Sequence, residues 1–295
     1  MLVPGIGIPV NGAQRWLRFE SLSLQPSELG RLVLPIVAAT ILTDSRSAGF
    51  PLRTVPVTLL PLALTLPLVA REPDLGATVF LAAGYVIALF IGGWPLRYFL
   101  LSVTIVIPAA ASLWILRPYQ MQRITGFVAA WQDLSQAPWQ IRQSLLSLGA
   151  GELHGTRIGS GWQKLSFLPE ANTDFVFAVI GEELGLVGTL TLIIVWTGVL
   201  LTGRAALKHL RRDSFGWILG TTLVIQLVLL ALANVAVVTA MVPPKGVPHP
   251  FISYGGSNLF VNVIAVGIVV GMARHGNDRS SVSVKQSLLS VDRTR

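Results

Sequence analysis

The chain of 295 residues contains no cysteine. A disulfide framework and a metal site built on thiolates are therefore excluded, and cysteine use gives no information on the redox compartment. Charged residues are also scarce, at 12%, whereas soluble domains carry about a quarter. Because 52% of the residues are hydrophobic, the composition excludes an ordinary soluble domain and indicates a polytopic membrane protein.

The sequence also lacks the common cofactor motifs. It has no HExxH, no Walker A motif and no dinucleotide fingerprint, so we predict no cofactor. Glu72, Asp74 and Asp174 could hold a divalent cation, but three dispersed carboxylates do not decide this. The net charge of +8 would suggest nucleic acid in a soluble protein. Here the basic residues fall mostly between apolar runs, so we expect no nucleic-acid partner.

Long apolar runs dominate the chain and predict an all-α, polytopic membrane bundle of about seven spans. Pro26, Ser27 and Glu28 form a plausible helix start before the first run, which is short. The runs are 32–43, 54–70, 75–96, 98–116, 184–203, 214–244 and 246–273.

Lys and Arg in the short loops predict the orientation of these spans. Segments 44–53 and 204–213 and the tail 274–295 are rich in basic residues and are expected to be cytoplasmic. The tail is polar and Ser-rich, which predicts disorder after a single membrane domain at 1–273. Three segments are then expected on the outer side, namely 71–74, the long loop 117–174 and the turn 243–257.

The long loop has a composition that argues against disorder. Segments 123–134 and 139–148 space their apolar residues as amphipathic helices do, which suits a position at the bilayer interface. The segment GAGELHGTRIGSGW (149–162) contains five glycines, which permit positive φ angles. It is either a binding loop or a flexible connector.

Five sequence blocks stand in the order and spacing of one known family. They are NGAQRW (11–16), QPSELGR (25–31), EPDLGA (72–77), FLPEANTDFVFAVIGEELGLVG (167–188) and PPKGVPHPFISYGGSNL (243–259). From Asn11 to about Gly271 the chain resembles the SEDS family, the FtsW/RodA/SpoVE peptidoglycan polymerases. Lys245-Gly246 resembles the FtsW-like, cell-division branch. The resemblance implies about ten spans, so this chain is expected to lack the first three helices of the family.

The resemblance implies a glycosyltransferase that polymerises lipid II, a lipid-linked disaccharide-pentapeptide, into glycan strands for cell division. It places this enzyme in the bacterial cytoplasmic membrane, with the active site on the extracytoplasmic side. A sugar C4 hydroxyl attacks an anomeric carbon, and a lipid pyrophosphate leaves. Such chemistry needs a carboxylate base and cations for the pyrophosphate. The implied partners are lipid II, a class B penicillin-binding transpeptidase and other membrane proteins of the division machinery.

Asp174 matches the essential aspartate of the family and is the candidate catalytic base. From the residues alone, Thr173 or Asp174 could equally be a plain N-cap, because both precede an apolar run. Asn172 stands where the family often has histidine, which leaves the proton path open. The candidate substrate-binding residues are Arg71, Glu72, Asp74, Lys164, Glu170, Glu183, Lys245, Ser253, Tyr254, Gly255, Gly256 and Ser257.

Each candidate has a plainer interpretation as well. The segment from Arg71 to Asp74 could be a polar hairpin tip, although Pro73 and Gly76 are expected to break the helix there. Glu170 could be solvated surface, and Glu183, with Glu182, an ordinary charged helix end. Lys245 could only anchor its turn at the membrane interface. In the functional interpretation, the stretch YGGS before helix 257–273 could also offer backbone N–H groups to a phosphate at the helix N-terminus. His249 replaces a residue that is commonly apolar in the family, and the sequence predicts no role for it.

Two other classes of function compete with the polymerase. A lipid II flippase or transporter would need ionisable groups at mid-membrane depth on helices. The charges here cluster in predicted outer segments, which favours the enzyme. A truncated, non-catalytic scaffold of the division complex is the other alternative.

Overall fold

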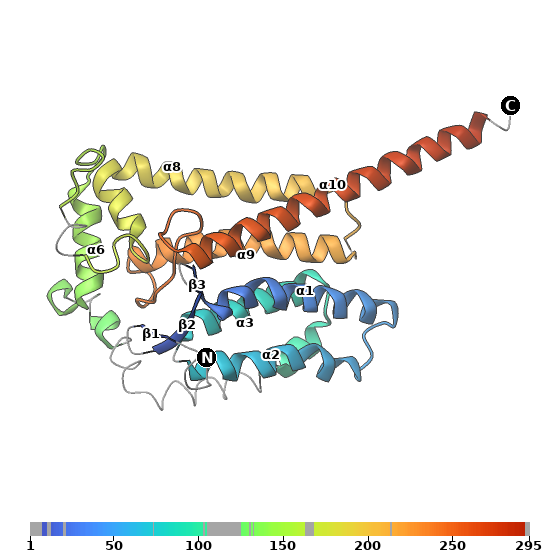
Figure 1. Ribbon diagram of the computed structural model, residues 1–295, viewed down its shortest axis with the longest axis horizontal. Coiled ribbons are helices and arrows are strands. Elements are labelled where there is room, and N and C mark those ends of the chain that lie inside the picture. Colours follow the sequence, from blue (N-terminus) through green and yellow to red (C-terminus); the bar gives the residue numbers. More distant parts are fainter. Residues whose placement is uncertain are drawn as a thin grey trace. The chain divides into compact units, whose positions relative to one another are not determined.

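The computed structural model describes residues 8–10, 13–19, 22–72, 74–102, 104, 125–129, 131, 133–162, 168–212 and 214–292. The chain divides into two compact units. Unit 1 comprises Met1–Trp94, Gly198–Gln226 and Phe260–Arg295, and unit 2 comprises Pro95–Thr197 and Leu227–Leu259. Helices α8 (Val176–Leu207), α9 (Phe215–Val238) and α10 (Gly256–Asp292), which are labelled in Figure 1, contribute residues to both units. The single membrane domain expected over 1–273 stays a prediction.

A small antiparallel sheet precedes the helices of unit 1. Its strands are β1 (Ile8–Val10), β2 (Ala13–Phe19) and β3 (Leu22–Leu24), in the order β1-β2-β3. The all-α prediction did not include it. The sequence did contain a signal, because Asn11-Gly12 separates the paired residues Val10 and Ala13, and this dipeptide is strongly favoured in two-residue hairpins.

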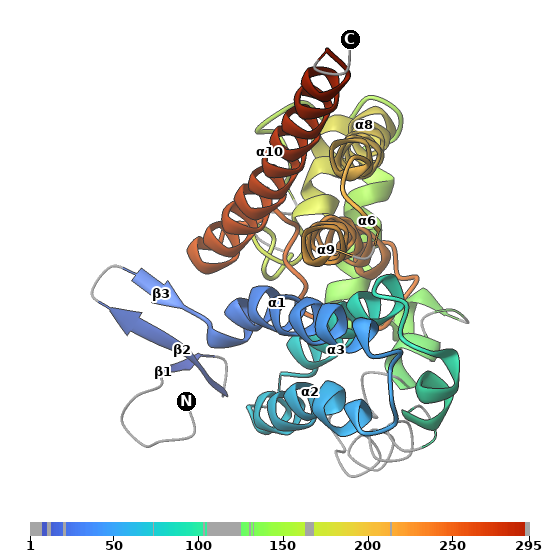
Figure 2. The ribbon, with the colours of Figure 1, turned by 90° about the vertical axis from the view of Figure 1, so that its right-hand side faces the viewer.

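Three helices of unit 1 pack together in the views of Figures 1 and 2, with α1 against α3 and α2. They are α1 (Pro26–Ser47), α2 (Thr54–Arg71) and α3 (Leu75–Ile91). The predicted start of α1 is confirmed, with Pro26 in the first turn and Glu28 at its positive end. A Cβ on Gly30 would lie 2.9 Å from Leu81 Cδ2, so a small residue permits the close approach of α1 and α3. The buried Tyr85 of α3 donates to the Thr58 carbonyl of α2 at 2.5 Å.

Helix α8 (Val176–Leu207) is interrupted at Gly185, whose φ of 65° and ψ of −160° are essentially restricted to glycine. The apolar run 184–203 predicted a span that begins at 184, whereas the helix begins eight residues earlier, at Val176. At the kink, the glycine-rich loop supplies hydrogen-bond partners for the helix backbone. The pairs are Thr156 N to Glu182 O at 2.9 Å, Arg157 N to Glu183 O at 3.2 Å, Leu186 N to Glu152 O at 2.9 Å and Val187 N to Leu153 O at 3.2 Å. The loop is therefore not a flexible connector.

The long loop contains regular structure, as its composition predicts. Helix α6 (Trp139–Ala150) covers the predicted amphipathic segment 139–148, and a short 3-10 helix, η1 (Leu134–Gln136), precedes it. The buried face of α6 holds Ile141, Ser144 and Ser147, and Ser144 Oγ donates to the Val238 carbonyl of α9 at 2.8 Å. This face of α6 therefore packs against protein.

Helices α9 (Phe215–Val238) and α10 (Gly256–Asp292) complete the structure. Between them 239–255 is not helical, as its proline and glycine content predicts. Helix α10 continues through 274–292, and the disorder expected for the tail 274–295 stays a prediction. No proline follows Gly276, and extending an existing helix costs less than nucleating one.

Within the described ranges, five helices are long and apolar enough to cross a membrane. They are Pro26–Ser47, Thr54–Arg71, Val176–Leu207, Phe215–Val238 and Gly256–Arg274, and the shorter Gly76–Ile91 is also apolar. The predicted span 98–116 lies mostly outside the described residues. The chain is a helical, multi-pass membrane protein.

We expect Gly185→Ala to destabilise the protein by about 2 kcal/mol or more, because alanine does not adopt this backbone conformation. Its Cβ would also lie 2.5 Å from Gly155 N in the docked loop. Gly198→Ala, in the same helix with no atom within 4 Å, is the matched control and should be neutral or slightly stabilising. Thermal unfolding of the purified proteins in detergent provides the comparison. Equal midpoints for the two variants would contradict the role assigned to Gly185.

Candidate functional site

The predicted catalytic aspartate lies in a tight turn at the start of α8. Glu170 has a φ of 54°, and its carbonyl accepts hydrogen bonds from Thr173 N at 3.1 Å and Phe175 N at 3.2 Å. Leu168, Ala171 and Phe175 are buried and anchor the segment 168–175. Asp174 is half-buried and lies two residues before the helix begins, as the sequence predicts.

The turn 239–255, between α9 and α10, provides the second half of the site. Val247, His249 and Ser253 are buried, and Lys245 is half-buried. His249 O accepts from Ile252 N at 3.3 Å and from Ser253 N at 3.0 Å, which closes the turn on itself. These bonds account for the fixed shape of a segment rich in proline and glycine.

Three consecutive carbonyls join the aspartate segment to its surroundings. The Asn172 carbonyl accepts from Tyr254 N at 2.8 Å, and the Thr173 carbonyl accepts from Ser253 Oγ at 2.5 Å. The Asp174 carbonyl accepts from Asn234 Nδ2 of α9 at 2.6 Å. The backbone leading into Asp174 is therefore held by two residues of the turn 239–255 and one residue of a membrane helix.

The Asp174 carboxylate lies over the backbone of Gly246. A Cβ on Gly246 would be 2.7 Å from Asp174 Oδ2, a distance that real Cβ atoms essentially never show. The glycine therefore leaves room for the carboxylate. The candidate base therefore lies against the residue that directly follows Lys245, the candidate cation, although the two segments are about seventy residues apart in the sequence.

A buried hydrogen-bond network joins the turn 239–255 to helices α8 and α9. Trp196 Nε1 donates to His249 Nε2 at 2.7 Å, and His249 Nδ1 contacts Asn234 Oδ1 at 3.1 Å. Asn234 Nδ2 also donates to the Val247 carbonyl at 2.7 Å. Burial of His249 lowers its pKa from the usual 6.5 to about 4. The sequence did not predict this network, although Asn234 is one of only two amide side chains in the apolar run 214–244, the other being Gln226, which is a usable signal.

The other residues of these two segments divide between exposed and structural positions. Thr173 Oγ1 donates to Glu170 Oε2 at 2.8 Å, so Thr173 does not cap α8 with its side chain. Ser253 Oγ accepts from His249 N at 2.7 Å besides donating to the Thr173 carbonyl, and both contacts are structural. Tyr254 is 84% exposed, Gly256 is the first residue of α10, and Ser257 is buried. Gly255 is half-buried.

The two glutamates of α8 stand just before its kink. Glu182 is buried, and its Oε1 accepts from Trp162 N of the glycine-rich loop at 2.8 Å. Glu183 is half-buried, and its carbonyl accepts from Arg157 N. Glu182 therefore anchors the loop, while the assignment of Glu183 to substrate stays a prediction. Lys164 lies outside the described residues.

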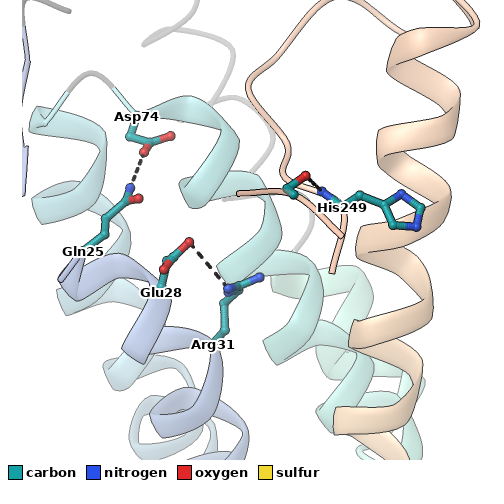
Figure 3. A network of polar contacts seen from close by, with 6 residues as sticks. Gln25, Glu28, Arg31, Asp74 and His249 are labelled. Carbon is teal, nitrogen blue, oxygen red and sulfur yellow. Dashed lines mark hydrogen bonds and ion pairs between the residues drawn. The ribbon is translucent and has the colours of Figure 1, made fainter. Parts of the chain in front are cut away.

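The acidic segment 71–74 belongs to unit 1 and connects α2 to α3. Asp74 caps α3 by accepting from Ala77 N at 2.9 Å, and its other oxygen accepts from Gln25 Nε2 at 2.9 Å (Figure 3). The expected break of the helix is confirmed, because α2 ends at Arg71 and α3 begins at Leu75, and Gly76 lies in the first turn of α3. Arg71 is exposed in the last turn of α2, and Glu72 is its C-cap. These contacts favour the hairpin-tip interpretation for Asp74.

A largely buried ion pair lies near the start of α1, where Arg31 Nη2 is 3.7 Å from Glu28 Oε1 (Figure 3). Among the residues that the structure describes, no three His, Asp or Glu side chains form a group that could hold a metal ion. Whether a divalent cation takes part stays open, and so does the prediction of no cofactor.

The chain is similar to known proteins over most of its length. The family model FTSW_RODA_SPOVE, described as a cell cycle protein, matches residues 1–278. A probable peptidoglycan glycosyltransferase FtsW of Trichlorobacter lovleyi is 38% identical over 280 residues, which cover 92% of this chain and 72% of the relative. A protein of the same name from Nitrosococcus halophilus is 41% identical over 276 residues, covering 91% and 70%.

Solved structures show the same fold. A chain from a peptidoglycan synthase complex that coordinates polymerization and crosslinking matches with a TM-score of 0.74. That match has 24% identity and covers 92% of this chain and 76% of the other. The rod shape determining protein RodA of Thermus thermophilus matches with a TM-score of 0.62, 25% identity and coverage of 92% and 72%. The family match and the identities above show that the chain belongs to the FtsW/RodA/SpoVE family of cell cycle proteins.

Proposed function

We propose that this chain is a peptidoglycan glycosyltransferase that joins lipid II units into glycan strands for cell division. The observation that carries the proposal is the contact of the Asp174 carboxylate with Gly246, in the turn that also carries Lys245. A carboxylate base beside a cation is what glycosyl transfer from a lipid pyrophosphate needs. The names of the FtsW relatives support the same activity.

In this proposal Asp174 accepts the proton of the attacking C4 hydroxyl as the new bond to the anomeric carbon forms. The bond between that carbon and the pyrophosphate oxygen breaks, and the lipid pyrophosphate leaves with the electron pair. Lys245 stabilises the negative charge that develops on this leaving group. The held carbonyls of residues 172–174 keep the base in place during the reaction.

The proposal extends to location and partners. The site is assigned to the extracytoplasmic side of the bacterial cytoplasmic membrane, on the basis of basic residues in the opposite loops. A class B penicillin-binding transpeptidase is proposed as the partner that crosslinks the strands, along with other division proteins. The likeness to a chain of a peptidoglycan synthase complex supports such an assembly.

Asp174→Asn should fold and bind precursor but lower polymerisation about 100-fold or more, the usual share of a general base. The assay is strand synthesis from purified lipid II in reconstituted vesicles, with translocation of lipid II followed in parallel. Asp133→Asn, an exposed carboxylate of the long loop, is the control and should keep the wild-type rate. Near-normal synthesis by Asp174→Asn would refute the assignment, and translocation without strands would favour a flippase.

Gly246→Ala tests the geometry without removing a charge. The backbone of Gly246 does not have a positive φ, so alanine is tolerated, but its Cβ forces the Asp174 carboxylate to move. We expect turnover to fall about 10-fold or more while the melting temperature stays close to that of the wild type. Gly267→Ala, with no atom within 4 Å of the new Cβ, serves as control. A wild-type turnover for Gly246→Ala would show that the carboxylate position does not matter.

Lys245→Ala should lower turnover about 10-fold or more if the ammonium group stabilises the leaving pyrophosphate. If Lys245 only anchors its turn at the membrane, turnover at saturating precursor should not change. Arg71→Ala is expected to behave as Lys245→Ala does, and Lys208→Ala, an exposed lysine after α8, is the control. Wild-type turnover for both site variants would remove cationic stabilisation from the mechanism.

A further inference from the structure

His249 occupies the centre of the buried network and is 0% exposed. Its ring bonds to residues of two helices, Trp196 of α8 and Asn234 of α9. Its backbone N–H donates to Ser253 Oγ, which in turn donates to the Thr173 carbonyl. One residue therefore connects to the aspartate segment by two routes, through Ser253 and through Asn234.

The hydrogen-bond partners determine the tautomer of the imidazole. An indole N–H only donates, so His249 Nε2 must be the acceptor of the bond from Trp196. The ring proton then resides on Nδ1 and is donated to Asn234 Oδ1. This orients the Asn234 amide so that its two N–H groups point to the Asp174 and Val247 carbonyls.

A second proton on the ring is incompatible with this arrangement. It would sit on Nε2 and face the Trp196 N–H, so that two donors would meet in a position closed to bulk solvent. The ring also stacks on Phe177 at a centroid distance of 6.5 Å, an apolar surface that does not compensate a charge. Phe177, Trp196 and Asn234, which face the ring from α8 and α9, do not titrate. The titratable groups that adjoin the network are Asp174, before α8, and Lys245, in the same turn as His249.

We propose that His249 is a positioning residue, whose neutral imidazole aligns Asn234 and thereby fixes the backbone of the catalytic Asp174 against the turn 239–255. This inference rests on the proposed role of Asp174. It assigns a function to a residue that touches neither the substrate nor the carboxylate. Protonation of His249 would break the bond from Trp196, while the Nδ1 bond to Asn234 persists, and would loosen the network that holds the base.

Two substitutions separate positioning from simple packing. His249→Phe keeps an aromatic ring against Phe177 but provides neither a donor nor an acceptor. His249→Gln retains one acceptor for Trp196 and one donor for Asn234, and it does not titrate. His209→Gln, at an exposed histidine after α8, is the matched control.

For His249→Phe we expect kcat to fall about 10-fold or more with KM within about twofold, because the base is displaced while the substrate contacts remain. His249→Gln should restore kcat to within about threefold of the wild type. The assay is strand synthesis from purified lipid II by the full chain in vesicles. Wild-type kcat for His249→Phe, or a His249→Gln variant as slow as His249→Phe, would overturn the proposal.

The pH dependence of stability gives a second test that does not need activity. The pKa of His249 is about 4 in the folded protein, against its usual value of 6.5 in the unfolded chain. Between pH 4 and pH 6.5 the unfolded chain therefore binds more protons than the folded protein does. The stability that the neutral ring contributes is complete above pH 6.5 and is lost as the pH falls towards 4. The thermal midpoint of the wild type should therefore fall further than that of His249→Gln over this window. Parallel curves would overturn the neutral-ring assignment, even if His249→Phe does not fold.

The two proposals can fail separately. If the wild type makes no strands and Asp174→Asn changes nothing, the proposed function fails, while the stability curves still report on the His249 network. If Asp174→Asn abolishes synthesis and His249→Phe does not alter it, only the positioning role is wrong.

Discussion

The site depends on one constraint, the attachment of three successive carbonyls to partners distant in the sequence. The carbonyls of residues 172–174 accept hydrogen bonds from Tyr254, Ser253 and Asn234. Buried polar groups need partners, so these bonds leave the segment little freedom to move. A carboxylate at the end of such a segment is positioned before any substrate arrives, which limits the reorganisation that the reaction would otherwise require.

A second constraint acts on the helix that follows. Gly185 interrupts α8, and the glycine-rich loop replaces hydrogen bonds that the interruption removes. Irregular backbone in a membrane protein is tolerated where protein supplies its partners. The buried Glu182 adds a hydrogen bond that its Oε1 accepts from the backbone N–H of Trp162. Glycine is thus needed at the kink for its φ angle and in the turn 239–255, at Gly246, for space.

Much of the candidate site could be predicted from local sequence because its signals are local. Proline and glycine in 243–256 predict a turn, and Asp174 before an apolar run predicts a position at a helix start. Both predictions are confirmed by the bounds of α8, α9 and α10. Asp74 shows the limit of prediction from local sequence, because the same acidic residue fits both a substrate site and an N-cap. Its bonds to Ala77 and Gln25 favour the second.

Composition and apolar runs by themselves determined that the chain is a multi-pass helical membrane protein, because the length and charge content of a span are local properties. Linked sequence blocks determined the family and the residues to consider. Only the tertiary structure brought Asp174 to Gly246 and joined Trp196, His249 and Asn234 in one network. The bond from Ser253 to the Thr173 carbonyl joins residues 80 positions apart, and no local period in a sequence encodes which distant donors and acceptors will meet.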